Sequence, residues 1–147
     1  MKKLLTLFIS LVYAALLASA PMEGVMDRDN YLDMARVSPL IIARHAGNGM
    51  QSVLANEPVW LAINSALGFL FEDEVVVRII IFFSAFIVSY LLLINNPKNF
   101  FWLLLILVFP QVMKNFVIHL RQGLAIAVFM LGWFSSGNKK RVFFIGL

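Results

Sequence analysis

Residues 75–94 read VVVRIIIFFSAFIVSYLLLI, a run of 20 residues that is apolar almost throughout. A helix of that length measures about 30 Å, which is the thickness of the hydrocarbon core of a bilayer. The run ends at Asn95-Asn96-Pro97-Lys98, where turn-forming residues replace apolar ones. This stretch predicts a transmembrane helix, and it places the chain among the all-α integral membrane proteins.

The composition of the whole chain also predicts a membrane protein. Of the 147 residues, 61% are hydrophobic and 14% are charged, whereas a soluble domain carries about 25% charged residues. At about 20 residues per crossing, the apolar content allows about four spans. We therefore expect a single membrane domain over residues 1–147, with spans near 4–20, 75–94, 100–118 and 120–134 and a polar outer loop at 21–74 that carries short or re-entrant helices. The absence of cysteine excludes disulfides, thiolate metal sites and thiol catalysis.

The distribution of charge predicts the orientation in the membrane. All eight acidic residues lie between Glu23 and Glu74, whereas lysines flank the apolar runs. Short loops rich in Lys and Arg stay in the cytoplasm, so the N-terminus, the 95–99 loop and the 138–141 loop are expected inside and residues 21–74 outside. The chain is thus predicted to be a multi-pass protein of the inner (plasma) membrane with a cytoplasmic N-terminus. Nucleic acid is not an expected partner, because the basic residues do not gather on one face.

The first apolar run, Leu4–Ala20, has two interpretations. It fits a first transmembrane helix, and it also fits a signal peptide, because Ala18-Ser19-Ala20 has the form of a cleavage site. Pro21 directly after that site favours an uncleaved helix. Residue 21 emerges on the outer face in either case.

Two prolines organise the predicted outer loop. The spacing of Leu32, Ala35 and Arg36 predicts a short helix within 31–44 that is interrupted at Pro39. Pro58 is suited to be the first residue of a second helix, over the apolar residues 59–71. Thirteen residues make about 20 Å of helix, so we expect an interfacial or re-entrant segment here and not a span.

Residues 100–134 must leave the cytoplasm and return within 35 residues, although two full crossings need about 40. Pro110 interrupts the outgoing half. Either the hairpin stops short of the far surface, or its turn lies at membrane depth inside a protein-lined, hydrated cavity. A further apolar run starts at 142–147, so we also expect the chain to be the N-terminal part of a longer protein.

Polar residues are concentrated in the turn of this hairpin. Gln111, Asn115 and His119 recur every four residues and are expected to share one helical face. Gln122 continues that face if the helix is unbroken, and Lys114 and Arg121, seven residues apart, are also expected on one side. Gly123 and Ala127 form a small-xxx-small pair that is typical of helix packing.

Two readings of these cations remain open. In the first, the turn lies at the outer interface, where Lys114 and Arg121 extend to water. In the second, cations and amide donors in a cavity bind a phosphate or diphosphate. Arg121 would then clamp the anion with two hydrogen bonds, and Lys114 would act as a point charge.

The outer loop supplies carboxylates on the side to which Arg121 is assigned. Asp27, Asp29, Glu57 and the run Glu72-Asp73-Glu74 are candidates for a general base toward a sugar hydroxyl, or else are simply solvated. Asp27, Asp29 and Asp33 are spaced closely enough to hold a divalent cation, but they lack the pattern of a calcium-binding loop, so no metal site is predicted.

Three segments resemble a known family. They are Asp27-Arg28-Asp29-Asn30-Tyr31, Asn56-Glu57-Pro58-Val59-Trp60 ahead of an apolar helix, and the run from His119 to Ala127, whose Arg-Gln-Gly-Leu-Ala block opens a span. In order and spacing they resemble the EpsG-like family of membrane polysaccharide polymerases, which are related in architecture to Wzy-type O-antigen polymerases. The similarity covers the chain from Asp27 onward, and further spans would be expected after Leu147.

The resemblance implies a glycosyltransferase that joins sugar repeat units carried on polyprenyl diphosphate, at the outer face of the membrane and without a cofactor. The implied partners are this lipid-linked oligosaccharide, the bilayer and other proteins of a polysaccharide assembly complex. The candidate catalytic residues are Glu57, Asp27 and Arg121, and the candidate substrate-binding residues are Tyr31, Lys114, His119 and Gln122. The alternative is a non-enzymatic component of a polysaccharide assembly or export complex, or an inactive fragment.

Overall fold

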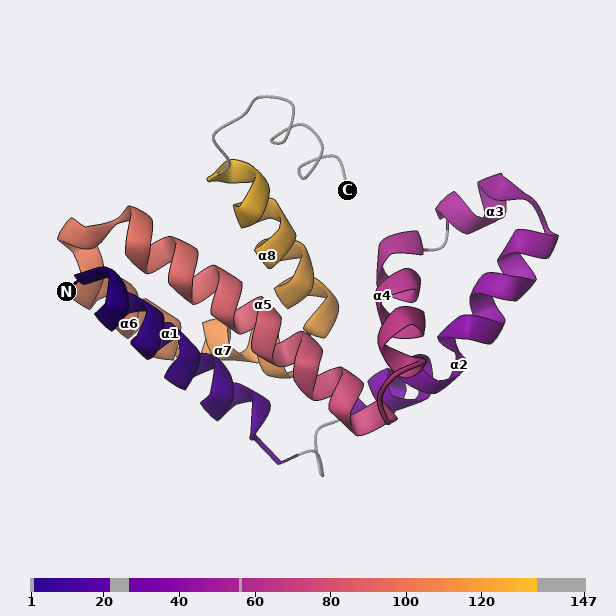
Figure 1. Cartoon of the computed structure of the whole chain (residues 1–147), viewed down its shortest axis with the longest axis horizontal. Coiled ribbons are helices and arrows are strands. Elements are labelled where there is room, and N and C mark those ends of the chain that lie inside the picture. Colours follow the sequence, from indigo (N-terminus) through magenta and orange to yellow (C-terminus); the bar gives the residue numbers. More distant parts are fainter. Residues whose placement is uncertain (1, 22–26, 56, 135–147) are drawn as a thin grey trace. The chain divides into compact units, whose positions relative to one another are not determined.

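The computed structural model describes residues 2–21, 27–55 and 57–134, and within them every regular element is a helix (Figure 1). The elements are α1 (Lys2–Ala18), α2 (Arg28–Gly47), α3 (Met50–Ala55), α4 (Pro58–Gly68), α5 (Asp73–Asn95), the 3₁₀ turn η1 (Pro97–Asn99), α6 (Phe100–Val108), α7 (Pro110–Val117) and α8 (Leu120–Trp133). The prediction of an all-α chain is therefore confirmed. The expected 138–141 loop and 142–147 apolar run lie outside the described residues, as does Asn56.

The chain forms two compact units, and α5 runs from one into the other. The first unit contains α1, the residues of α5 from Ile79 onward, and α6, α7 and α8. The second contains α2, α3, α4 and the chain up to Arg78. The segment that was expected to be a loop carrying short helices is thus a compact unit, and its α2 is a helix of 20 residues.

In the second unit, α2 and α4 pack along one another and α3 joins them. The ring of Tyr31 on α2 meets the ring of Trp60 on α4 edge to face, with 5.6 Å between their centroids, and both residues are buried. Gly68 makes the close approach of the two helices possible, because a Cβ atom there would lie 3.1 Å from the backbone oxygen of Ala35.

Pro39 does not interrupt α2, so the predicted interruption is wrong. A proline within a helix removes the N–H that would bond to the carbonyl four residues earlier, and in α2 that carbonyl belongs to Ala35. This oxygen is the one that faces Gly68 of α4. The hydroxyl of Ser38 also donates to the carbonyl of Met34. Packing between α2 and α4 therefore covers the gap that Pro39 leaves, and the helix continues to Gly47.

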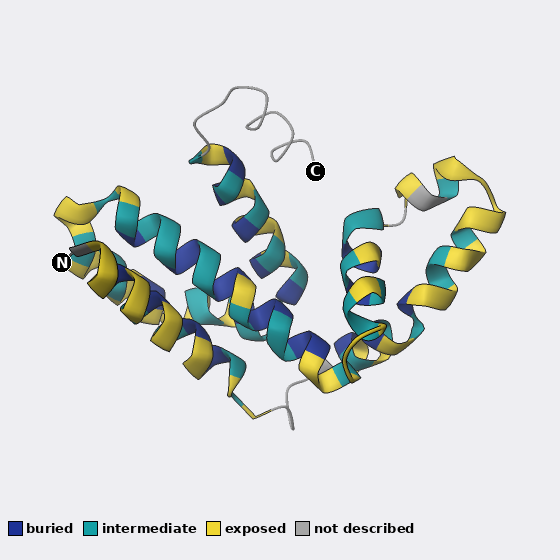
Figure 2. Ribbon diagram, viewed as in Figure 1, coloured by how far each residue is buried: buried dark blue, intermediate teal, exposed yellow. Residues whose placement is uncertain are grey.

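In the first unit, α1 turns small and hydroxyl-bearing side chains inward. Its buried residues are Thr6, Ser10, Ala14 and Leu17, whereas Leu4, Phe8 and Leu16 are 74%, 64% and 66% exposed. Most of α1 is accordingly coloured as exposed in Figure 2. The hydroxyl of Tyr13 donates to the carbonyl of Leu107 at 2.8 Å and ties α1 to α6.

Of the described helices, α5 is the one that is long and apolar enough to cross a membrane, with 23 residues. It contains the predicted span at 75–94. The pair α6 and α7 would add a second crossing if it counted as one segment, but it bends by 67° at Phe109. The helices α1 and α8 are apolar but shorter than a span. Pro110 is the first residue of α7, which confirms the predicted break.

Candidate functional site

The candidate site in the first unit is built on the hairpin of α7 and α8. Helix α7 ends at Val117, where the carbonyl of Lys114 accepts hydrogen bonds from the N–H groups of Ile118 (2.8 Å) and His119 (3.1 Å). The chain then turns, and α8 starts at Leu120. Arg121 and Gln122 consequently lie in the first turn of a helix, as the sequence predicted for the Arg-Gln-Gly-Leu-Ala block.

Gly123 fixes the start of α8 against α7. A Cβ atom at Gly123 would lie 2.7 Å from the backbone oxygen of Asn115 and 3.1 Å from Cδ1 of Phe116. Phe116 and Leu120 are both buried beside this approach, and Ala127 is buried one turn further along α8. Gly123 of the small-xxx-small pair therefore packs at the contact between α7 and α8, and this contact sets the position of the neighbouring Arg121.

The start of α8 has the features of an anion-binding site. The first N–H groups of a helix have no partner within the helix, and the helix dipole adds positive potential there. Arg121 lies in this first turn with its Nε atom buried, and Gln122 beside it is exposed. A guanidinium can donate two parallel hydrogen bonds to a phosphate. The first N–H groups of α8, the guanidinium of Arg121 and the side-chain amide of Gln122 are thus hydrogen-bond donors of the kind that bind a phosphate or diphosphate.

The shared polar face that the spacing predicted is only partly present. Gln111 and Asn115 lie one turn apart on α7, as expected. His119 precedes α8, so the prediction that it shares the face of Gln111 and Asn115 is wrong. Gln122 was expected to continue that face only in an unbroken helix, and it lies in α8, after the break. Lys114 and Arg121 are likewise on different helices, and the expectation that a seven-residue spacing places them on one side of one helix fails. The cause is the break at residues 118–119, because residues on either side of a break no longer follow one helical repeat.

The three other nominated residues lie in the second unit. Asp27 directly precedes α2, is half-buried, and its carbonyl accepts a hydrogen bond from the N–H of Tyr31 at 3.2 Å. Tyr31 is 9% exposed and packs on Trp60, so the structure gives its ring a packing role. Its assignment to substrate binding stays a prediction.

Glu57 has an unusual backbone. Its φ of 52° and ψ of 55° lie in the left-handed region, which costs a non-glycine residue about 1–2 kcal/mol. Its carbonyl accepts the N–H of Leu61 at 3.1 Å and begins α4, with Pro58 as the first helical residue. The carboxylate-bearing side chain is exposed. The predicted helix start at Pro58 is confirmed, and Glu57 stands directly before it.

An acidic groove in the second unit contains a residue that sequence reasoning missed. Arg36 pairs with Asp73, with 2.9 Å between Nη2 and Oδ2. Leu32, Glu72 and Glu74 complete an open groove of about 430 Å³. The run Glu72-Asp73-Glu74 is visible in the sequence, but Arg36 lies 37 residues away from its partner and no local signal connects the two. Among the residues that the structure describes, no three His, Asp or Glu side chains gather as metal ligands.

The nominated residues thus form two sets. Lys114, His119, Arg121 and Gln122 belong to the first unit, and Asp27, Tyr31 and Glu57 to the second. Comparison of the chain with protein-family models, curated proteins and solved structures gives no match.

Proposed function

We propose that the chain is part of a membrane polysaccharide polymerase that joins sugar repeat units carried on polyprenyl diphosphate, at the outer face of the membrane. The observation that carries the proposal is the placement of Arg121 in the first turn of α8, on a helix start fixed against α7 by Gly123. A diphosphate leaving group needs such a cluster of donors. The resemblance of the three sequence segments to the EpsG-like family supplies the reaction.

Burial in the first unit supports a membrane setting. On α1, the small residues Thr6, Ser10 and Ala14 are buried together with Leu17, whereas the large apolar residues Leu4, Phe8 and Leu16 are exposed. On α6, Phe101 and Trp102 are 67% and 66% exposed. Soluble monomers rarely expose apolar surface on this scale, whereas membrane helices pack through small residues and turn large ones to lipid. In this proposal α1, α5, the α6–α7 pair and α8 all lie in the bilayer.

The ends of the helices agree with the orientation that the charges predict. Lys3 on α1 and Pro97 on η1 line the same cavity, so the N-terminus and the 95–99 loop lie at one end of the unit. The positive-inside rule requires these two segments to share the cytoplasmic side. The broken α6–α7 segment also supports the proposal, because irregular backbone at membrane depth is characteristic of substrate sites in transporters and related proteins.

The proposed chemistry divides the roles between cations and carboxylates. A carboxylate accepts the proton of the acceptor hydroxyl, a role for which the sequence resemblance nominates Glu57 and Asp27, and the acceptor oxygen forms a bond to the anomeric carbon of the donor sugar. The bond from that carbon to the diphosphate oxygen breaks, and the electron pair goes to the diphosphate. Arg121, assisted by Lys114, stabilises the charge that develops there. His119 and Gln122 contribute further donors, and Tyr31 is assigned to the sugar.

Polymer length tests the role of Arg121. In a strain that lacks the chromosomal gene, Arg121→Ala and Arg121→Lys are both expected to shorten the polysaccharide, because lysine cannot reproduce a bidentate fork. Arg44→Ala is the matched control, since Arg44 is an exposed arginine outside both candidate sets. Unchanged long chains from both Arg121 variants would exclude the clamp. If they occurred while deletion of the gene still abolished polymer, and Glu57→Gln and Asp27→Asn also left the chains long, the result would favour a non-enzymatic component.

A further inference from the structure

A cavity at the end of the first unit is not used by the proposed chemistry. Its volume is about 440 Å³, within the range of about 300–1,000 Å³ that is usual for sites of small ligands. It lies between the N-terminal end of α1 and the C-terminal end of α5, where η1 follows. The lining residues are Lys3, Leu5, Thr6, Leu93, Ile94, Pro97 and Phe100.

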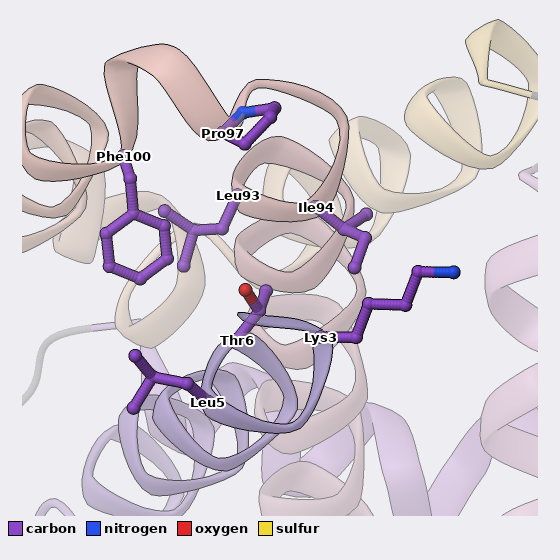
Figure 3. A pocket seen from close by; sticks show the side chains of 7 residues that line it. All are labelled: Lys3, Leu5, Thr6, Leu93, Ile94, Pro97 and Phe100. Carbon is purple, nitrogen blue, oxygen red and sulfur yellow. The ribbon is translucent and has the colours of Figure 1, made fainter. Parts of the chain in front are cut away.

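The lining combines apolar side chains with one cationic group, which suits an amphiphilic ligand. Figure 3 shows the side chains of Leu93, Phe100 and Leu5 as apolar walls, with the ammonium group of Lys3 at the margin. Lys3 is exposed, so its charge remains in contact with water. An occupant that matches this lining has a hydrocarbon portion for the walls and a negative charge for the margin.

We propose that this cavity binds an anionic phospholipid, with one acyl chain between α1 and α5 and the phosphate beside Lys3. Charge complementarity selects the anionic lipid, because basic pockets between membrane helices at the cytoplasmic side bind acidic head groups. Lys98 is exposed at the same end but is not one of the lining residues, so the proposed site assigns the phosphate contact to Lys3 alone. The inference rests on the membrane setting proposed above, but it is independent of the polymerase reaction.

Competition between two lipids tests the proposal. The purified full chain is equilibrated in mixed micelles with equal amounts of phosphatidylglycerol and phosphatidylcholine, and the lipids that it retains are counted by native mass spectrometry. The wild type is expected to retain phosphatidylglycerol preferentially. Lys3→Gln is expected to lower that preference about fivefold, which corresponds to the loss of one lysine at a membrane surface.

Two further variants distinguish lipid binding in this cavity from general electrostatic attraction between the protein and anionic lipids. Lys98→Gln removes the same charge from the same end without altering the lining, and it is expected to leave the preference unchanged. Leu5→Trp places bulk in the cavity at a residue that is 53% exposed, so folding should persist and retention of both lipids should fall. Equal effects of Lys3→Gln and Lys98→Gln, or full retention by Leu5→Trp, would overturn the site.

Flotation with liposomes distinguishes two negative outcomes: the chain associates with a bilayer but has no lipid site, or the chain does not associate with a bilayer at all. A chain that floats with liposomes but shows no lipid preference refutes the lipid site alone and leaves the polymerase proposal standing. A chain that does not associate with liposomes refutes both, because both require a bilayer.

Discussion

Replacement of Gly123 by alanine tests whether close packing of α7 and α8 fixes the start of α8. The new Cβ would lie 2.7 Å from the oxygen of Asn115 and 3.3 Å from Cα of Phe116. Both are backbone atoms, so rotation of a side chain cannot relieve the contact and α8 must move. Overpacking of this kind costs about 1–3 kcal/mol, and a backbone contact belongs at the upper end of that range. Alanine recovers about 1 kcal/mol of helix propensity over glycine.

The net expectation for Gly123→Ala is a free energy of unfolding that is lower by about 1–2 kcal/mol. The measurement is denaturant unfolding in detergent micelles, followed by the helical circular dichroism signal. Polymer synthesis should also fall, because Arg121 moves with the first turn of α8.

Gly47→Ala is the matched control for this experiment. Gly47 is the last residue of α2, and a Cβ atom there would meet no atom within 4 Å. The same substitution should therefore leave stability unchanged or raise it, by up to about 1 kcal/mol. If Gly123→Ala were as stable as the wild type, the packing argument for the position of Arg121 would be refuted.

Two further substitutions probe single interactions. Tyr13→Phe removes the hydrogen bond to the carbonyl of Leu107 and is expected to lower the free energy of unfolding by about 0.5–1.5 kcal/mol in the same assay; an unchanged value would mean that this bond does not tie α1 to α6. Asn64 is fully buried, and its Oδ1 atom has no hydrogen-bond partner although its Nδ2 donates to the carbonyl of Trp60. Asn64→Leu is therefore expected to be neutral or stabilising by about 1 kcal/mol, and a loss above about 1 kcal/mol would show that the amide is needed.

The features that sequence predicted correctly depend on local properties. A proline lacks an N–H wherever it stands, so Pro58 could be placed at the start of α4 and Pro110 at the break between α6 and α7. The length and composition of 75–94 determine a long apolar helix without reference to any other segment. The Arg-Gln-Gly-Leu-Ala block was expected to open a helix, and α8 begins one residue before Arg121.

The features that sequence missed depend on contacts between distant residues. Pro39 was expected to interrupt a helix, but α2 continues because Gly68 of α4 packs on the carbonyl that the proline leaves without its helical donor. The pairing of Arg36 with Asp73 joins residues that are 37 positions apart. Neither contact leaves a periodic signal in the sequence, so neither could be inferred before the packing of the helices was known.

The polar face of the hairpin was predicted only in part for a related reason. A repeat of four residues implies one face only if the helix is unbroken. The carbonyl of Lys114 accepts hydrogen bonds from two N–H groups at the end of α7. Because the helix ends there, His119 does not lie on the face of α7 that carries Gln111 and Asn115. The part of the prediction that depends only on local sequence is confirmed: a helix starts at Leu120, and the cationic Arg121 lies in its first turn.

The exposure of the α8 start to the outer face is the central claim, and cysteine labelling measures it most directly. The chain contains no cysteine, so Gln122→Cys places one thiol at an exposed position beside Arg121, and Lys98→Cys places one at the predicted cytoplasmic end. In intact cells a membrane-impermeant maleimide should label position 122 and spare position 98 until the membrane is permeabilised. Labelling of position 122 only after permeabilisation would contradict the account, because it would place Arg121 away from the proposed site of polymerisation.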